Sequence, residues 1–222
     1  DIDGWICYST KDLVNWKYEG EIMSAKDISW ATGSTSAWAA QTIKHNGKYY
    51  FYYCTWDATS GNGQQSIGVA VSDSPTGPFK DLGKPVVSGK VTDFGTESST
   101  WNDIDPTVWI EKDDKGEEHR YLAWGNGNYY ICELNDDMIS VKDQNGDGKI
   151  TGGTSTKTAD VIQKTSVTSY TEAPWLYRRQ DANGNYYGKY YLFYASGWRE
   201  GMSYATTDDL LNGEWSEGKE IA

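Results

Sequence analysis

A repeated aromatic segment constrains the fold of this chain more than any other feature of its sequence. Residues 47–53 (GKYYFYY) return as residues 188–194 (GKYYLFY), and a weaker copy lies between them at residues 118–124 (EHRYLAW). Successive copies begin 71 and 70 residues apart. A fixed spacing of this size is the signature of a repeat architecture, in which each copy is one unit of supersecondary structure.

Further strand-like elements recur around this segment in a constant order. One precedes it, at residues 36–43, 104–110 and 171–177; one follows it, at residues 5–12, 67–73, 130–136 and 202–208; and one closes the unit, at residues 13–16, 76–79 and 212–215. Four short, aromatic-rich strands per repeat are typical of the blades of a β-propeller. The sequence therefore predicts an all-β protein of the propeller class.

The repeat also predicts where the blades begin and end. We expect the outer half of one blade at residues 1–30 and full blades at residues 31–90, 91–165 and 166–222, about three and a half blades in all. A propeller that does not close leaves unpaired strand edges, so we expect a chain truncated at both ends. The alternative is a stack of ordinary antiparallel sandwiches with accidental similarity, and the regular spacing argues against it.

Composition excludes several classes of partner. The formal net charge is −12, from 32 Asp and Glu against 20 Lys and Arg, and the basic residues are scattered. An acidic surface repels nucleic acid and anionic membranes, and no apolar run approaches the roughly 18 residues of a membrane span. We therefore expect neither nucleic acid nor membrane as a partner, and neutral substrates fit better. The widely spaced Cys7, Cys54 and Cys132 are expected to be buried free thiols.

Two carboxylates open the first strands of different repeats. Asp105 is followed by Pro106, and Glu172 precedes Ala173 and Pro174. In a propeller these strands line the central axis, so carboxylates at their openings converge, and proline fixes the direction of the chain. Glycoside hydrolysis needs such a pair of carboxyl groups. The alternative is that both are solvated turn residues.

Four tryptophans are candidates for binding sugar rings. They fall at strand openings or in the loops expected to rim the funnel: Trp38, Trp56, Trp101 and Trp198. Aromatic faces stack on the apolar faces of sugars. Packing between blades is the alternative for each of them.

A polar insertion near residues 142–160 carries a possible calcium loop. Asp143, Asn145 and Asp147 place oxygen ligands at alternate positions, as in the first half of an EF-hand. The twelfth position is Thr154, which cannot supply the bidentate carboxylate. Calcium binding and a simple polar hairpin turn both remain open.

Together these motifs resemble glycoside hydrolase family 43. The segments that carry the resemblance follow one another in order at residues 5–16, 38–50, 104–107 and 172–174. The resemblance implies a five-bladed propeller that needs no cofactor. It also implies an inverting hydrolase of the α-L-arabinofuranosidase or β-xylosidase type, acting on arabinoxylan, xylan or arabinan of the plant cell wall. A secreted or extracellular protein is the corresponding expectation.

The resemblance also assigns roles to residues. Glu172 corresponds to the general acid, and Asp105 to the carboxylate that modulates the pKa of that acid and orients it. The family's general base lies on a strand that would precede Asp1, so we expect the base outside this chain and the chain alone to be inactive. Asp1 and Asp3 come too late in the repeat to replace it. A non-catalytic, carbohydrate-binding propeller is the alternative function.

Overall fold

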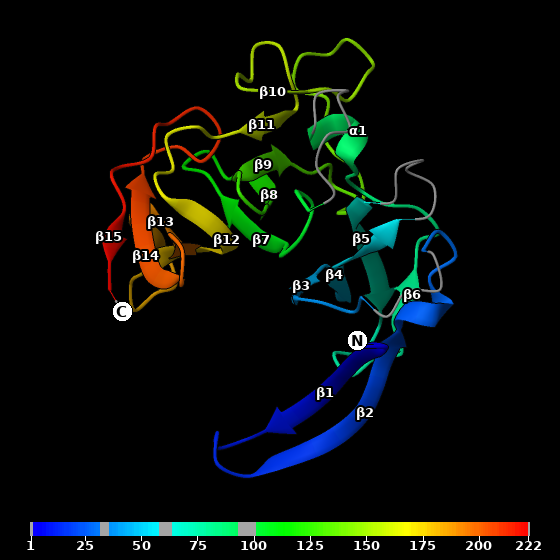
Figure 1. Cartoon of the computed structure of the whole chain (residues 1–222). Coiled ribbons are helices and arrows are strands. Elements are labelled where there is room, and N and C mark those ends of the chain that lie inside the picture. The colour runs from blue at the N-terminus through cyan, green and yellow to red at the C-terminus, as the bar shows by residue number, and fades with distance from the viewer. Residues whose placement is uncertain (1, 32–35, 58–63, 93–100, 222) are drawn as a thin grey trace.

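The computed structural model of the chain describes residues 2–31, 36–57, 64–92 and 101–221. Within these ranges almost all regular structure is β-strand, as predicted, and Figure 1 shows the sheets following one another along an arc. The two helical turns are the 3-10 helix η1 (Ala25–Asp27) and α1 (Gly89–Thr92). No helix in the described ranges has the length and apolar character of a membrane span.

The strands form four sheets that follow the order of the chain. The first pairs β1 (Gly4–Thr10) with β2 (Trp16–Ser24). The second contains β3 (Ala40–His45), β4 (Lys48–Asp57), β5 (Gln64–Ser72) and β6 (Lys80–Asp81). The third contains β7 (Thr107–Lys112), β8 (Glu118–Trp124), β9 (Tyr130–Glu133), β10 (Gly152–Gly153) and β11 (Val161–Gln163). The fourth contains β12 (Tyr170–Gln180), β13 (Tyr186–Ser196), β14 (Gly201–Thr207) and β15 (Lys219–Glu220).

The pairing within the sheets is that of simple antiparallel meanders, with one addition. Strand orders are β3-β4-β5-β6 and β12-β13-β14-β15 in the second and fourth sheets. In the third sheet, the polar insertion contributes β10, which pairs in parallel with β11 at the outer edge. The sheets lie within the predicted ranges 1–30, 31–90, 91–165 and 166–222; the assignment of each range to one blade of a five-bladed ring stays a prediction.

The hydrophobic core lies between neighbouring sheets. One cluster packs the second sheet against the third and includes Tyr52, Ile67, Leu122 and Trp124. Another packs the third against the fourth and includes Ile131, Ile162, Leu176, Leu192 and Trp215. A third joins the first sheet to the second through Met23, Trp30 and Phe51. Because neighbouring sheets bury the faces that they turn toward each other, the stack extends sideways, as in a propeller.

The sheets at the two ends of the stack keep exposed aromatic faces. On the fourth sheet Trp175 is 52% and Tyr177 is 44% exposed, and on the first sheet Trp16 and Tyr18 are 56% and 55% exposed. Equivalent faces between the sheets are closed by the three core clusters. Exposed aromatic faces of this kind are typical of surfaces that pack against further protein.

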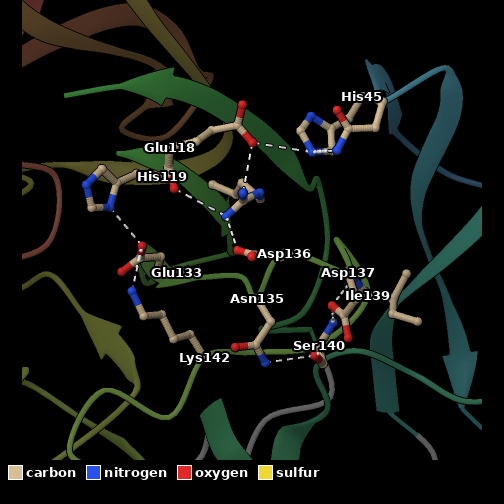
Figure 2. Close-up of polar contacts among 12 residues, drawn as sticks. His45, Glu118, His119, Glu133, Asn135, Asp136, Asp137, Ile139, Ser140 and Lys142 are labelled. Carbon is tan, nitrogen blue, oxygen red and sulfur yellow. Dashed lines mark hydrogen bonds and ion pairs between the residues drawn. The ribbon is translucent and has the colours of Figure 1, made fainter. Parts of the chain in front are cut away.

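Polar side chains also connect the second and third sheets (Figure 2). His45 Nε2, at the end of β3, lies 3.3 Å from Glu118 Oε1 at the start of β8, and Arg120 binds Glu118 and Asp136, at 2.8 Å each. His119 Nδ1 lies 2.9 Å from Glu133 Oε1 on β9. Both histidines are engaged at the hairpin ends of their strands, away from the openings that carry the predicted acids.

Candidate active site

The structure brings Asp105 and Glu172 together from different sheets. Asp105 lies two residues before β7, and Glu172 is the third residue of β12. The Oδ2 atom of Asp105 accepts a hydrogen bond of 3.1 Å from the backbone N–H of Ala173, the residue that follows Glu172. The repeat predicts that the two strand openings converge. In the structure, this hydrogen bond joins the two segments directly.

Both segments adopt an unusual backbone conformation at this contact. Asp105 has φ of 58° and Ala173 has φ of 55°, in the left-handed region. For a residue other than glycine this conformation costs on the order of 1–3 kcal/mol, and it persists where the surroundings hold it. Such residues concentrate at functional sites. Here they turn the chain at the entry to β7 and near the start of β12.

The surroundings change the ionisation of Asp105. Burial raises the pKa of Asp105 to about 6, and the negative charges of Glu172 and Glu200 add to the effect, while the hydrogen bond from Ala173 opposes it. A carboxyl group with this pKa changes its charge in mildly acidic solution. Perturbed carboxyl groups of this kind are enriched at catalytic sites. The reverse effect, of Asp105 on the acid, stays a prediction.

Glu172 is held by a side chain that no sequence motif indicates. Asn126 Nδ2 donates a 2.8 Å hydrogen bond to Glu172 Oε2. Asn126 lies in the loop between β8 and β9, and we call residues 125–128 of it the Asn126 loop. In the sequence this loop reads GNGN after a strand, a pattern that indicates a turn and gives no hint of a contact with a residue 46 positions away.

Buried polar groups support the segment that carries Asp105. Asp103 is almost fully buried; its Oδ1 accepts a bond of 2.7 Å from Trp124 Nε1, and its Oδ2 accepts one of 3.0 Å from Thr92 Oγ1. The buried thiol of Cys54 contacts Ala39 O at 3.7 Å, and burial raises the pKa of Cys54 to about 12, so this thiol stays protonated. Asp103 is a further supporting residue for which the sequence carries no separate signal.

The cysteines are free, as predicted. Cys54 and Cys132 are buried, and Cys7 is half-buried. Burial raises the pKa of the Cys132 thiol as well. Cys54 and Cys132 therefore behave as small, unreactive core residues.

Three of the four candidate tryptophans form one cluster. The Trp38 and Trp101 rings stack with centroids 5.2 Å apart and planes 4° from parallel, and Trp56 meets Trp101 edge-on at 6.3 Å. Trp101 is 47% exposed, so part of it faces solvent. Trp198 is separate and 93% exposed; with Glu200 it lines a hollow of about 720 Å³ at the turn between β13 and β14. Their roles as sugar platforms stay predictions.

The possible calcium loop closes on itself. The two carboxylate oxygens of Asp143 accept backbone bonds from Gly146 at 2.6 Å and Gly148 at 2.8 Å, and Asn145 Oδ1 accepts one from Asp147 at 2.9 Å. These contacts describe a polar turn. Within the described part of the chain, one group of three side chains of types that can ligate a metal lies close together. It is elsewhere, at the β7–β8 hairpin: Asp113, Glu117 and His119.

The other aspartates near the start of the chain have different partners or lie outside the described residues. Asp3 is exposed and pairs with Lys26 at 3.0 Å, and Asp1 lies outside the described residues. Asp57 is buried and accepts a 3.0 Å bond from Ser66. Asp105, in contrast, makes the contact that joins the two strand openings.

Comparison with known sequences gives consistent matches. The family model described as glycosyl hydrolases family 43 matches residues 1–208. The chain is 31% identical to the β-D-galactofuranosidase xynD of Aspergillus niger over 216 residues, which make up 90% of this chain and 52% of that protein. It is 27% identical to a xylosidase/arabinosidase of Bacteroides ovatus, covering 91% of this chain and 62% of that protein. It is 31% identical to an extracellular endo-α-(1→5)-L-arabinanase of Thermotoga petrophila, covering 56% of this chain and 31% of that protein.

Solved structures share the fold. An α-L-arabinofuranosidase of Clostridium thermocellum matches with a TM-score of 0.69 and 30% identity, over 100% of this chain and 62% of that one. A β-xylosidase/α-arabinofuranosidase from a compost metagenome, in complex with xylotriose in its calcium-free form, matches with a TM-score of 0.65 and 23% identity, over 97% of this chain and 66% of that one. The chain thus spans about half to two thirds of the two curated relatives that match over most of its length.

Proposed function

Since the chain belongs to family 43 of the glycosyl hydrolases, we propose that its protein hydrolyses glycosidic bonds of pentose-containing plant polysaccharides, with Glu172 as general acid. The observation that supports this most directly is the contact between the two strand openings. The Asp105 carboxylate binds the backbone N–H next to Glu172, and Glu172 itself is bound through one oxygen by Asn126. The Asp105 carboxylate is thus anchored to the residue that follows Glu172, and Asn126 engages one of the two oxygens of Glu172, Oε2.

The proposed reaction is inversion by general acid and base catalysis. Glu172 donates its proton to the leaving oxygen as the glycosidic bond breaks, and a base carboxylate activates water on the opposite face of the sugar. Asp105 holds the segment of Glu172 in place and contributes a charge beside it. The base is proposed, as the resemblance implies, to come from outside residues 1–222.

The substrate class is proposed from the names of the relatives. Arabinofuranosidase, xylosidase and arabinanase names favour arabinoxylan, xylan or arabinan. The Aspergillus niger relative adds a second candidate, a β-D-galactofuranoside. Arabinofuranosides and galactofuranosides share a five-membered ring and differ in an exocyclic carbon. An extracellular location is proposed with them, since the Thermotoga petrophila relative carries that word in its name.

Turnover by the whole protein tests this function. We expect release of arabinose or xylose from arabinoxylan, arabinan or xylo-oligosaccharides, with inversion at the anomeric carbon seen by proton NMR. Preferential hydrolysis of an aryl β-D-galactofuranoside would select the second candidate. Binding of these polysaccharides without turnover of any glycoside would instead establish the alternative, a non-catalytic carbohydrate-binding propeller.

Calcium is proposed to bind weakly at most. Both oxygens of Asp143 are engaged by backbone N–H groups, and Thr154 stands where an EF-hand has its bidentate carboxylate. We expect calorimetry to give a dissociation constant no tighter than about 10⁻⁴ M for this loop, the range of weak extracellular sites. A submicromolar site that disappears in Asp143→Ala, and persists in Asp114→Ala, would overturn this expectation.

A further inference from the structure

We propose that Asn126 is the positioning residue of Glu172, and that it selects which oxygen of this carboxyl group carries the catalytic proton. This inference rests on the proposed function. The contact is a 2.8 Å hydrogen bond from Asn126 Nδ2 to Glu172 Oε2. A carboxylate oxygen can only accept, so the amide nitrogen of Asn126 faces it as a donor.

The hydrogen bond from Asn126 makes the two oxygens of the Glu172 carboxyl group chemically different. Oε2 accepts the hydrogen bond from Asn126, and an oxygen that already carries a proton is a poorer acceptor. The proton of the acid form is therefore favoured on Oε1, the oxygen to which Asn126 does not donate. A general acid must present its proton in one fixed direction toward the leaving oxygen. Asn126 supplies that direction.

The Asn126 loop is tied to both segments of the site. Gly125 N donates to Ile104 O at 3.0 Å, next to Asp105, and Gly127 N donates to Thr171 O at 2.7 Å, next to Glu172. Tyr170 OH donates to Gly125 O at 2.9 Å. These bonds hold the loop between the two strand openings, with Asn126 at its centre.

The loop conformation also requires glycine at its start. Gly125 has φ of +139°, and a Cβ atom added there would lie 1.9 Å from the carbonyl oxygen of Asn128. A side chain at this position would force the loop open. The backbone conformation of the loop therefore fixes the position of Asn126 next to Glu172. An incidental contact at the surface would not require such a conformation.

The charged surroundings set the expected effect of pH. Asp105 is the carboxyl group beside Glu172, and the negative charges of Glu172 and Glu200 both act on it. Tyr170, which is protonated, donates a hydrogen bond to the backbone of the Asn126 loop. An aspartate in place of Asn126 would add a further negative charge at hydrogen-bond distance. Glu172 would then lose its proton only at higher pH.

Three variants of the whole protein test the proposal. We expect Asn126→Ala to lower kcat by about 10- to 100-fold on pentose oligosaccharides, the loss of one hydrogen bond to a charged group, with KM unchanged. With a dinitrophenyl pentoside, whose leaving group needs little protonation, kcat should fall by only about 3-fold or less.

Asn126→Asp should move the alkaline limb of the pH–rate profile to higher pH. Asn128→Ala is the matched control: its side chain lies in the same loop but accepts from Gln163 Nε2 at 2.7 Å, and activity should stay unchanged.

The outcomes separate this inference from the proposed function. Equal losses of kcat on both substrates in Asn126→Ala overturn the positioning role. An alkaline limb of the pH–rate profile that does not move in Asn126→Asp overturns it as well. Both results count even when the wild type is active and depends on Glu172. A readout without turnover is the side-chain amide signal of Asn126 in NMR. The change of this signal with pH should be larger in the wild type than in Glu172→Gln, where only the ionisation of neighbouring groups such as Asp105 remains. A pH response that is the same in both proteins overturns the inference whether or not the protein hydrolyses any glycoside.

Discussion

Glu172→Gln in the whole protein is expected to lower kcat on pentose oligosaccharides by about 10²- to 10⁴-fold, the contribution of a general acid. An alkoxide leaves poorly without a proton, and glutamine keeps the shape of the side chain while removing the proton. Aryl pentosides with an activated leaving group should lose much less. The ratio of the two losses, measured on purified protein, is the test.

Two comparisons make this result specific. Glu21→Gln, at an exposed position on β2 of the first sheet, should leave both activities unchanged. External azide or formate should not restore turnover of the oligosaccharide, because these ions replace a missing base or nucleophile and the leaving oxygen still lacks its proton. Similar losses on activated and natural substrates would show that Glu172 binds substrate and does not protonate it.

The repeat carries enough information to predict the sheets. A weak resemblance to residues 47–53 predicts a strand at residues 118–124, and these residues form β8. The reason is that each sheet buries aromatic and aliphatic side chains against its neighbours, which forces the same pattern onto every copy. The polar insertion has no counterpart in the other copies, so β10 and its parallel pairing with β11 leave no such trace.

The candidate site is predictable only where it follows from strand order. Asp105 and Glu172 open equivalent strands, so the repeat alone predicts that they converge. Asn126 follows the C-terminal end of the neighbouring strand β8, in a loop whose composition indicates only a turn. Its contact with Glu172 depends on how two sheets are set against each other, which local sequence does not encode. The tryptophans show the same limit: Trp38 and Trp101 stack, while Trp198 stands apart.

Asp105→Asn is expected to stabilise the fold at neutral pH while it lowers activity. Burial and the charges of Glu172 and Glu200 raise the pKa of Asp105 from 3.8 to about 6. In the folded state its ionisation is therefore disfavoured relative to the unfolded state. Asp105 costs no stability below about pH 4, where it is protonated in both states, and the cost grows as the pH rises to about 6. The pKa difference sets an upper limit of about 3 kcal/mol.

Asparagine removes this cost without removing the contact that Asp105 makes. Its amide oxygen can accept the N–H of Ala173, and asparagine tolerates the left-handed conformation, with φ of 58°, better than most residues. The thermal midpoint of Asp105→Asn should therefore exceed that of the wild type at pH 7.5 by about 2–6 °C, and the gap should close by pH 4. Asp114→Asn, at an exposed position, should show no such pH-dependent gap. A gap that is constant with pH would mean that the difference in stability does not come from the ionisation of Asp105. A variant less stable at pH 7.5 would mean that the fold favours the charged form of Asp105.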